Sequence, residues 1–115
     1  MSREQKPLTE FQFYVLVGLA QSADGGLHGY GIVQAIEQIT NGLRKYALPS
    51  LYETLRTLAT RGLIELDRTE EESGRLRKYF RITGPGVRSM KDYYIESEKI
   101  QRSVRKQSAL KPANG

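Results

Sequence analysis

Residues 28–62 contain two amphipathic segments joined by a short connection, and they read HGYGIVQAIEQITNGLRKYALPSLYETLRTLATRG. In the first segment, apolar residues recur three and four positions apart, which predicts one buried face of a helix. These residues are Ile32, Ala35, Ile36 and Ile39. Asn41-Gly42 is typical of a helix end, because glycine readily adopts the left-handed conformation found there. The first segment therefore predicts a helix that follows Gly29.

The second segment has a similar periodicity but a different beginning. Pro49 favours the first turn of a helix, where a missing N–H costs nothing, and Gly62 favours the end of that helix. The predicted buried face consists of Leu51, Leu55, Leu58 and Ala59. Because the connection between Gly42 and Pro49 is short, we expect the two helices to pack at an angle, as in a helix-turn-helix.

A further helix is predicted before this pair. Thr9 and Gln12 have the spacing of a capping box, and apolar residues at helical spacing follow the cap. These residues are Phe11, Val15, Leu16 and Leu19. We expect residues 22–26, SADGG, to end this helix in a flexible loop.

Two strands and a long helix are predicted after the pair. Residues 64–68 and 78–82 alternate apolar and polar side chains, which predicts a hairpin. We expect residues 70–74, EEESG, to form its loop and to make its tip acidic. Thr83 is the expected N-cap of a helix over residues 84–108, and residues 109–115 are expected to be a disordered tail.

The order of these elements predicts a mainly α fold with a small β-hairpin wing. It is the layout of a winged helix-turn-helix that continues into a long C-terminal dimerisation helix. We expect the winged domain to span residues 1–83 and to bind DNA, and the dimerisation helix to span residues 84–108.

Three motifs of the chain resemble the PadR family of transcriptional regulators. The motifs are His28-Gly29-Tyr30-Gly31-Ile32, the set Ser50-Leu51-Tyr52 with Leu55, Leu58 and Arg61-Gly62-Leu63-Ile64, and Arg77-Lys78-Tyr79-Phe80-Arg81-Ile82-Thr83 with Gly86. The resemblance covers residues 8–90. The family usually has a small hydroxyl residue at the position of Ala47 and a flexible residue at that of Pro49. We therefore expect the first turn of the second helix of the pair to differ from the family pattern.

The composition excludes several classes of protein. The chain has no cysteine and one histidine, His28, so cysteine-ligated metal sites and disulfides are excluded. A single histidine without partners makes neither a metal site nor a catalytic triad, and no carboxylate constellation or phosphate-binding glycine loop is recognisable. We therefore expect no enzyme, no metal and no cofactor. No segment is apolar enough to cross a membrane or to act as a signal peptide, so we expect a cytoplasmic protein with no membrane partner.

The charge of the chain points to a polyanionic partner. The formal net charge is +5 and the isoelectric point is about 9.6, which favours nucleic acid or an anionic surface. Residues 44–61 carry four cations against Glu53 alone. Positive charge therefore gathers in the stretch that also contains the second helix of the pair.

We predict that double-stranded DNA contacts this helix, the connection before it and the second strand of the hairpin. The predicted contacts are Arg44, Lys45, Ser50, Tyr52, Glu53, Arg56, Thr57, Arg75, Arg77 and Lys78. A helix that reads bases needs short hydroxyls, a cation and an acceptor for the amino group of cytosine. Two alternatives remain open: the exposed helix face is simply solvated, or the hairpin cations pair with residues 70–72 across the hairpin. We expect His28 and Tyr30 to be structural residues.

The last predicted helix carries a short heptad seam. The seam consists of Met90, Tyr93, Ser97, Ile100 and Val104. Because the preceding elements already close a core, we expect the seam to contact a second copy of the chain, and we include Phe11, Tyr14 and Tyr94 in the predicted homodimer interface. The resemblance to PadR also implies a small aromatic effector at this interface, beside Phe11, Phe13, Tyr14 and Tyr94.

Taken together, these features predict a sequence-specific transcriptional regulator, a repressor that acts as a homodimer on a palindromic operator. The alternative is a winged-helix module that binds another protein instead of DNA. The acidic hairpin tip favours that alternative, and the basic stretch 44–61 favours DNA.

Overall fold

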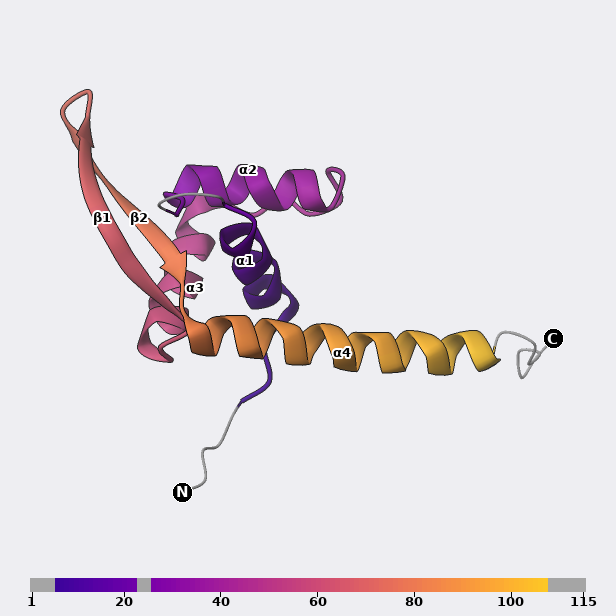
Figure 1. Cartoon of the computed structure of the whole chain (residues 1–115). Helices are drawn as coiled ribbons and strands as arrows, with labels where there is room; N and C mark the ends of the chain where they lie inside the picture. Colours follow the sequence, from indigo (N-terminus) through magenta and orange to yellow (C-terminus); the bar gives the residue numbers. More distant parts are fainter. Residues whose placement is uncertain (1–5, 23–25, 108–115) are drawn as a thin grey trace, which may run out of the picture.

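The computed structural model describes residues 6–22 and 26–107. Its elements are α1 (Glu10–Ala20), α2 (Gly29–Ile39), α3 (Leu48–Thr60), β1 (Ile64–Glu72), β2 (Arg75–Ile82) and α4 (Gly84–Lys106). In Figure 1 the helices α1 to α3 lie together, the β1–β2 hairpin rises on one side of them, and α4 begins at the foot of the hairpin and runs past α1 away from the domain. The predicted winged helix-turn-helix fold is confirmed. The predicted tail and residues 23–25 of the predicted loop lie outside the described residues.

The core lies where the three short helices meet the base of the hairpin. Its buried residues are Val15, Leu16, Leu19, Ile32, Ile36, Leu51, Leu55, Leu58, Leu63 and Ile64. Their exposed fractions are 5% or less, so each contributes roughly 1.5–3 kcal/mol of burial free energy relative to an exposed position. The faces predicted for α1, α2 and α3 from apolar periodicity supply most of this core.

The helix ends follow local chemistry that the sequence already shows. Gln12 N–H donates to Thr9 Oγ1 and Thr9 N–H donates to Gln12 Oε1, each at 3.0 Å, so the predicted capping box is formed. Gly42 and Gly62 have φ values of 79° and 75°, a conformation that costs glycine little. The predicted ends of α2 and α3 are therefore confirmed.

The hairpin is longer than predicted, because residues 70–72 belong to strand β1 and not to a loop. The turn consists of Ser73 and Gly74, with φ values of 53° and 78°, as in the two-residue turns that fit a twisted hairpin. Glu70 then lies opposite Arg77, and Glu72 lies opposite Arg75. Opposite charges across a strand pair are stabilising. Residues 70–72 can therefore form an exposed strand, although glutamate does not favour strands by itself.

The hairpin is joined to the chain segment before α2. Leu27 N–H donates to Phe80 O at 3.0 Å, and Phe80 N–H donates to Leu27 O at 2.9 Å. A Cβ on Gly26 would lie 2.0 Å from Phe80 O, so the close approach of the two backbones requires glycine at this position. The wing and the N-terminus of α2 are therefore connected directly by backbone hydrogen bonds.

Helix α4 leaves the domain through a joint with the end of α3. Thr83 Oγ1 accepts from Gly86 N–H at 3.1 Å and donates to Gly62 O at 2.7 Å, while Thr83 N–H donates to Leu63 O at 3.1 Å. A Cβ on Gly86 would lie 2.1 Å from Leu63 O. The predicted N-cap at Thr83 is thus confirmed, and the same residue fixes α4 to the loop after α3.

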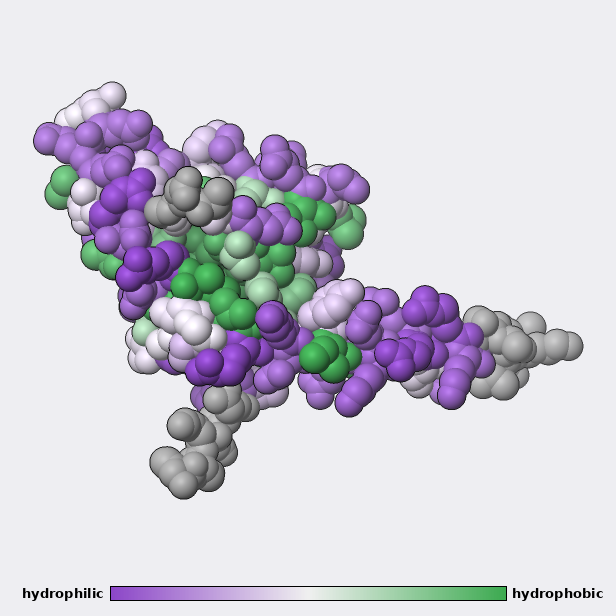
Figure 2. Space-filling model, in the orientation of Figure 1, coloured by the Kyte–Doolittle hydropathy of each residue, from purple (hydrophilic) through white to green (hydrophobic). Residues whose placement is uncertain are grey.

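The two halves of α4 have different surroundings. Met90 packs against the core cluster, and the Tyr93 ring stacks on Phe13 with centroids 4.2 Å apart. The predicted seam is therefore not wholly available to a second copy of the chain, because its first residues, Met90 and Tyr93, are half-buried within their own chain. Every side chain from position 99 to position 107 is exposed, including Ile100 at 62% and Val104 at 61%. Figure 2 shows mostly hydrophilic residues over this distal half and a group of hydrophobic ones around α1.

Candidate nucleic-acid interface

Helix α3 presents the polar face that its sequence predicts. Ser50, Tyr52, Glu53, Arg56 and Thr57 are all exposed. Within the described residues no ion pair joins Glu53 to Arg56; Thr57 Oγ1 instead donates to the Glu53 carbonyl at 3.2 Å. The carboxylate of Glu53 is therefore not neutralised by a partner on its own helix.

The first turn of α3 lacks a side-chain cap. Ala47 occupies the N-cap position and makes no side-chain hydrogen bond to the helix, and Pro49 lies in the first turn. Both features agree with the predicted departure from the family pattern. The N–H groups of a first turn that has no capping side chain can donate to an anion such as a phosphate.

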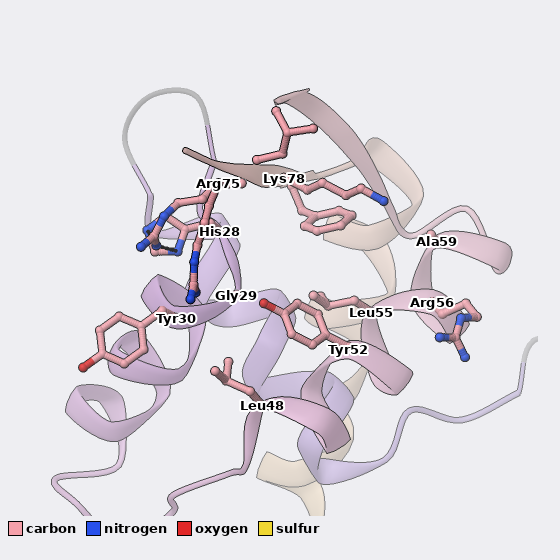
Figure 3. Close-up of a pocket in the computed structure, with 13 residues that line it drawn as sticks. His28, Gly29, Tyr30, Leu48, Tyr52, Leu55, Arg56, Ala59, Arg75 and Lys78 are labelled. Carbon is pink, nitrogen blue, oxygen red and sulfur yellow. Dashed lines mark hydrogen bonds between the residues drawn. The ribbon is translucent and has the colours of Figure 1, made fainter. Parts of the chain in front are cut away.

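A cleft separates α3 from the wing, and we refer to it as the wing cleft. It has a volume of about 840 Å³. Its lining comes from the first turn of α2, the exposed side of α3 and strand β2, and it consists of His28, Gly29, Tyr30, Leu48, Tyr52, Leu55, Arg56, Ala59, Arg75, Leu76, Arg77, Lys78 and Phe80. Figure 3 shows Tyr30 and Tyr52 on the two helices below the strand that carries Arg75 and Lys78.

Tyr30 and Tyr52 are the large aromatic side chains that remain open to solvent in this cleft. Their exposed fractions are 54% and 51%, so the expectation that Tyr30 is a packing residue is wrong. A Cβ on Gly29 would lie 2.8 Å from the Tyr52 hydroxyl, which shows that the Tyr52 ring lies directly against the first turn of α2.

His28 connects α2 to the wing. Its Nδ1 accepts from Gly31 N–H at 3.3 Å and thereby caps α2, which confirms the expected structural role. Arg77 Nη1 lies 3.3 Å from the other ring nitrogen, Nε2, and the Tyr79 ring meets the imidazole edge-on at 5.1 Å. Burial, and then the positive charge of Arg77, lower the pKa of His28 below 6.5, so the neutral form that accepts the hydrogen bond is favoured.

Arg77 is also paired with Glu72, whereas its neighbours on the strand are not paired. Arg77 Nε lies 2.8 Å from Glu72 Oε1, in an ion pair without an aligned hydrogen bond. In the described part of the chain, Arg75 and Lys78 have no carboxylate within ion-pair distance. The cross-hairpin alternative thus holds for Arg77 and not for Arg75 or Lys78, which are exposed at the edge of the wing cleft.

Arg44 and Lys45 do not line the wing cleft. Arg44 pairs with Glu10 at 3.1 Å, and this carboxylate raises the pKa of Arg44 above its usual range. Lys45 pairs with Glu37 at 3.4 Å. The structure therefore places both cations beside α1 and α2. Exposed pairs of this kind are worth only about 0–1 kcal/mol, and the DNA contacts of Arg44 and Lys45 stay predictions.

Several of the predicted interface aromatics have ring partners within their own chain. Phe11 stacks on Tyr46 with ring centroids 3.7 Å apart, Tyr14 packs against the core, and Phe13 is covered by Tyr93. Tyr94 stays exposed at 56%. The helix face formed by Tyr94, Ser97, Ile100 and Val104 is therefore the part of the predicted dimer interface that this chain leaves most open.

Residues 6–22 and 26–107 contain no group of three or more histidine, cysteine, aspartate or glutamate residues placed to hold a metal ion. None of their helices combines the length and the apolar character needed to cross a membrane.

Comparison with known proteins places the chain among regulators. The family model of the transcriptional regulator PadR-like family matches residues 16–92. A solved transcriptional regulator from Clostridium thermocellum is 26% identical, with 88% of this chain and 90% of that chain aligned and a TM-score of 0.71. A PadR family transcriptional regulator from Eggerthella lenta is 22% identical, with 87% and 82% aligned and a TM-score of 0.69. No curated protein matches the sequence.

A similar fold is also known bound to DNA. Bacillus subtilis PadR, solved in complex with operator DNA, aligns with 77% of this chain and 49% of its own length, at 22% identity and a TM-score of 0.65. The family match runs from the middle of α1 through the helix pair and the wing to the first half of α4, so it contains the whole wing cleft. The chain belongs to the PadR-like family of transcriptional regulators.

Proposed function

We propose that the protein binds double-stranded DNA through the exposed face of α3 and the wing cleft beside it. The observation that carries this proposal is the charge of the cleft: its lining includes four cations, Arg56, Arg75, Arg77 and Lys78, and no carboxylate. Such a cleft attracts the phosphate backbone. The similarity to a PadR protein solved with operator DNA supports the same conclusion.

The geometry suggests a division of roles between helix and wing. Helix α3 enters the major groove, where Ser50, Glu53 and Arg56 reach base edges or nearby phosphates. On the wing, Arg75 and Lys78 contact the backbone, because they are exposed and unpaired in the described part of the chain. Contacts of this second kind fix the position of the protein on DNA and carry no sequence information.

We further propose that the protein acts as a homodimer through α4. The distal half of this helix is exposed on all sides, and a helix of that length is only marginally stable in water by itself. Pairing of the face with Tyr94, Ser97, Ile100 and Val104 buries apolar surface that the chain leaves open. A symmetric dimer matches a palindromic operator. We propose that the protein represses transcription by occupying such an operator.

The small aromatic effector remains a prediction from the family resemblance. Three of the four aromatic rings expected beside it, those of Phe11, Phe13 and Tyr14, contact other side chains of the same protomer. An effector at the dimer interface would therefore be expected to meet Tyr94 first.

The protein-interaction alternative loses the observation that favoured it. Glu70 pairs with Arg68 at 2.6 Å, and Glu72 pairs with Arg77. Two of the three glutamates at positions 70–72 are thus paired locally, and the turn itself is Ser73-Gly74. The wing tip therefore carries less unpaired negative charge than its sequence indicates, with Glu71 the member of this run that has no ion pair in the described part of the chain.

Selection of bound DNA from a random pool at one fixed salt concentration tests the proposal. We expect enrichment of a palindromic site and retention that falls steeply as salt is raised. Failure to retain any duplex DNA at low salt would contradict DNA binding.

Light scattering tests the dimer. We expect twice the 13.1 kDa chain mass for the wild type, and a lower mass for Ile100→Glu, which places an unpaired charge in an apolar contact. Ile95→Glu is the matched control, because Ile95 is also exposed but lies about 140° around the helix from Ile100. A monomer for the wild type, or equal effects of both substitutions, would contradict pairing through this face.

A further inference from the structure

A second groove lies on the other side of α3, and we refer to it as the N-terminal groove. It has a volume of about 1220 Å³ and is formed by the segment before α1, the C-terminal half of α3 and the first turns of α4. Its lining includes the cations Lys6, Arg56, Arg61 and Arg88 and one carboxylate, Asp92. These cations come from distant parts of the sequence, and the fold brings them to one groove.

Helix α3 forms the ridge between the two clefts. Arg56 lines both of them. On one flank, Tyr52 and Ala59 face the wing cleft; on the other, Thr57 and Thr60 face the N-terminal groove. The polar face of α3 is therefore bordered by positive charge on both sides.

This arrangement matches the geometry of a helix in the major groove. That groove is about 12 Å wide, and a sugar–phosphate backbone runs along each of its edges. A helix inserted into it has a phosphate strand on either flank. We propose that the wing cleft takes one strand and that the N-terminal groove takes the other, with Lys6 and Arg88 as its phosphate contacts. This inference rests on the proposed DNA binding.

Lys6 and Arg88 are available for such contacts. Both residues are exposed. Within the described residues neither is within ion-pair distance of a carboxylate, although Asp92 lies one helical turn after Arg88. An exposed cation without a carboxylate partner breaks no ion pair when it binds phosphate. Its full charge is therefore available to displace counterions from the DNA.

Arg61 has a different role in the same groove. One of its guanidinium nitrogens donates to the Lys6 carbonyl, and another donates to Gln12 Oε1 at 3.4 Å. The same Gln12 oxygen closes the capping box of α1 by accepting from Thr9 N–H. Arg61, at the C-cap of α3, thus holds the segment that carries Lys6 against the recognition helix, and we assign it as a positioning residue.

The test is the salt dependence of binding to the selected DNA site, measured with the full chain. Each phosphate contact that is lost should reduce the slope of log affinity against log salt by about one. We expect this loss for Arg88→Gln and for Lys6→Gln, with the preferred sequence unchanged. The matched controls are Arg102→Gln and Lys99→Gln on the same α4 helix. Arg102 lies about 21 Å along the helix from Arg88, so both controls should retain the wild-type slope.

The positioning role of Arg61 has its own readout. Arg61→Ala should reduce the slope by about one in the wild-type background. It should cause no further reduction in the Lys6→Gln background, because the contact that it positions is already absent. Additive losses would show that Arg61 contacts phosphate itself or acts only through stability, and would overturn this assignment.

The outcomes separate this inference from the proposed function. If the wild type binds duplex DNA with a steep salt slope but Arg88→Gln and Lys6→Gln behave like their controls, the N-terminal groove is not a phosphate site and the wing cleft still is. If the wild type binds no duplex DNA, the proposed function fails first. Thermal unfolding of each variant at the same salt concentrations verifies that all are folded, which is expected because Arg61 is only half-buried and the other substituted positions are exposed.

Discussion

The two faces of α3 differ in what determines their residues. The inner face carries Leu51, Leu55 and Leu58, with exposed fractions of 0–3%, and these are dictated by the core. The outer face carries Glu53, Arg56 and their neighbours, which are exposed and should contribute little to folding. One helix therefore combines a face that the fold requires with a face that the fold leaves available for recognition. Substitutions on the first should change stability, and substitutions on the second should change DNA binding.

The largest expected effect is on the inner face. Leu58→Ala should lower the free energy of unfolding by about 2–5 kcal/mol, because it removes buried methyl groups and leaves a cavity. Thr60→Ala, two residues later and exposed, should change it by less than about 0.5 kcal/mol. Urea unfolding followed by circular dichroism measures both. Equal destabilisation by the two substitutions would remove the distinction between the faces.

On the outer face, Glu53→Ala tests base reading. A carboxylate that accepts from a cytosine amino group should give about 1–3 kcal/mol of preference at one position of each half-site. Removal of the carboxylate should weaken the base preference at that position of the half-site. Affinity for non-specific DNA should hold or rise, because a negative charge is lost. The measurement is site selection with both proteins at one salt concentration. An identical preferred site would show that Glu53 reads no base.

The wing should behave as a positioning element, with effects that are smaller and independent of sequence. Lys78→Ala should weaken binding to all DNA sequences and reduce the salt slope by about one. Arg77→Ala should reduce the slope by less, because Arg77 is already paired with Glu72. A larger reduction for Arg77 than for Lys78 would mean that the pair opens in the complex.

The smallest expected effect is a pH dependence that involves His28. Its pKa in the folded protein lies below 6.5, so the unfolded chain binds the proton more tightly. The stabilising contribution of neutral His28 is therefore present above pH 6.5 and is lost as the pH falls toward the folded-state pKa. His28→Asn keeps a capping acceptor that does not titrate. Between about pH 7.5 and pH 5.5, the wild type should lose stability relative to this variant; parallel curves would contradict the prediction.

Local chemistry made much of the fold predictable. Thr9, Gly42, Gly62 and Thr83 are residues whose preferred positions follow from their own hydrogen-bonding or backbone properties, and each begins or ends a helix as predicted. The strand that includes residues 70–72 was not predicted, because it does not follow from the preferences of its own residues. Three glutamates do not favour a strand by themselves, and the partners that two of them have, Arg68 for Glu70 and Arg77 for Glu72, are fixed only in the folded hairpin.

The site was predictable along α3 and less so around it. The exposed positions of α3 follow from helical periodicity, whereas the partners of Arg44 and Lys45 depend on tertiary contacts. Glu10 lies 34 residues before Arg44, and no periodicity within one element relates the two. Likewise, Lys6, Arg61 and Arg88 belong to three separate segments, and the groove that they share has no signature in the sequence.

The joint between α3 and α4 has a consequence for the spacing of a DNA target. Thr83 fixes the start of α4 to Gly62 and Leu63, and Gly86 lies against the Leu63 backbone with no room for a side chain. The angle between α3 and α4 is therefore set by backbone contacts. In a dimer joined through α4, that angle determines how far apart the two α3 helices lie, and the half-sites of an operator must match that distance, about 34 Å for one turn of DNA. A residue that touches no base can thus decide which separation of half-sites the protein accepts, while each half-site keeps the same preferred sequence.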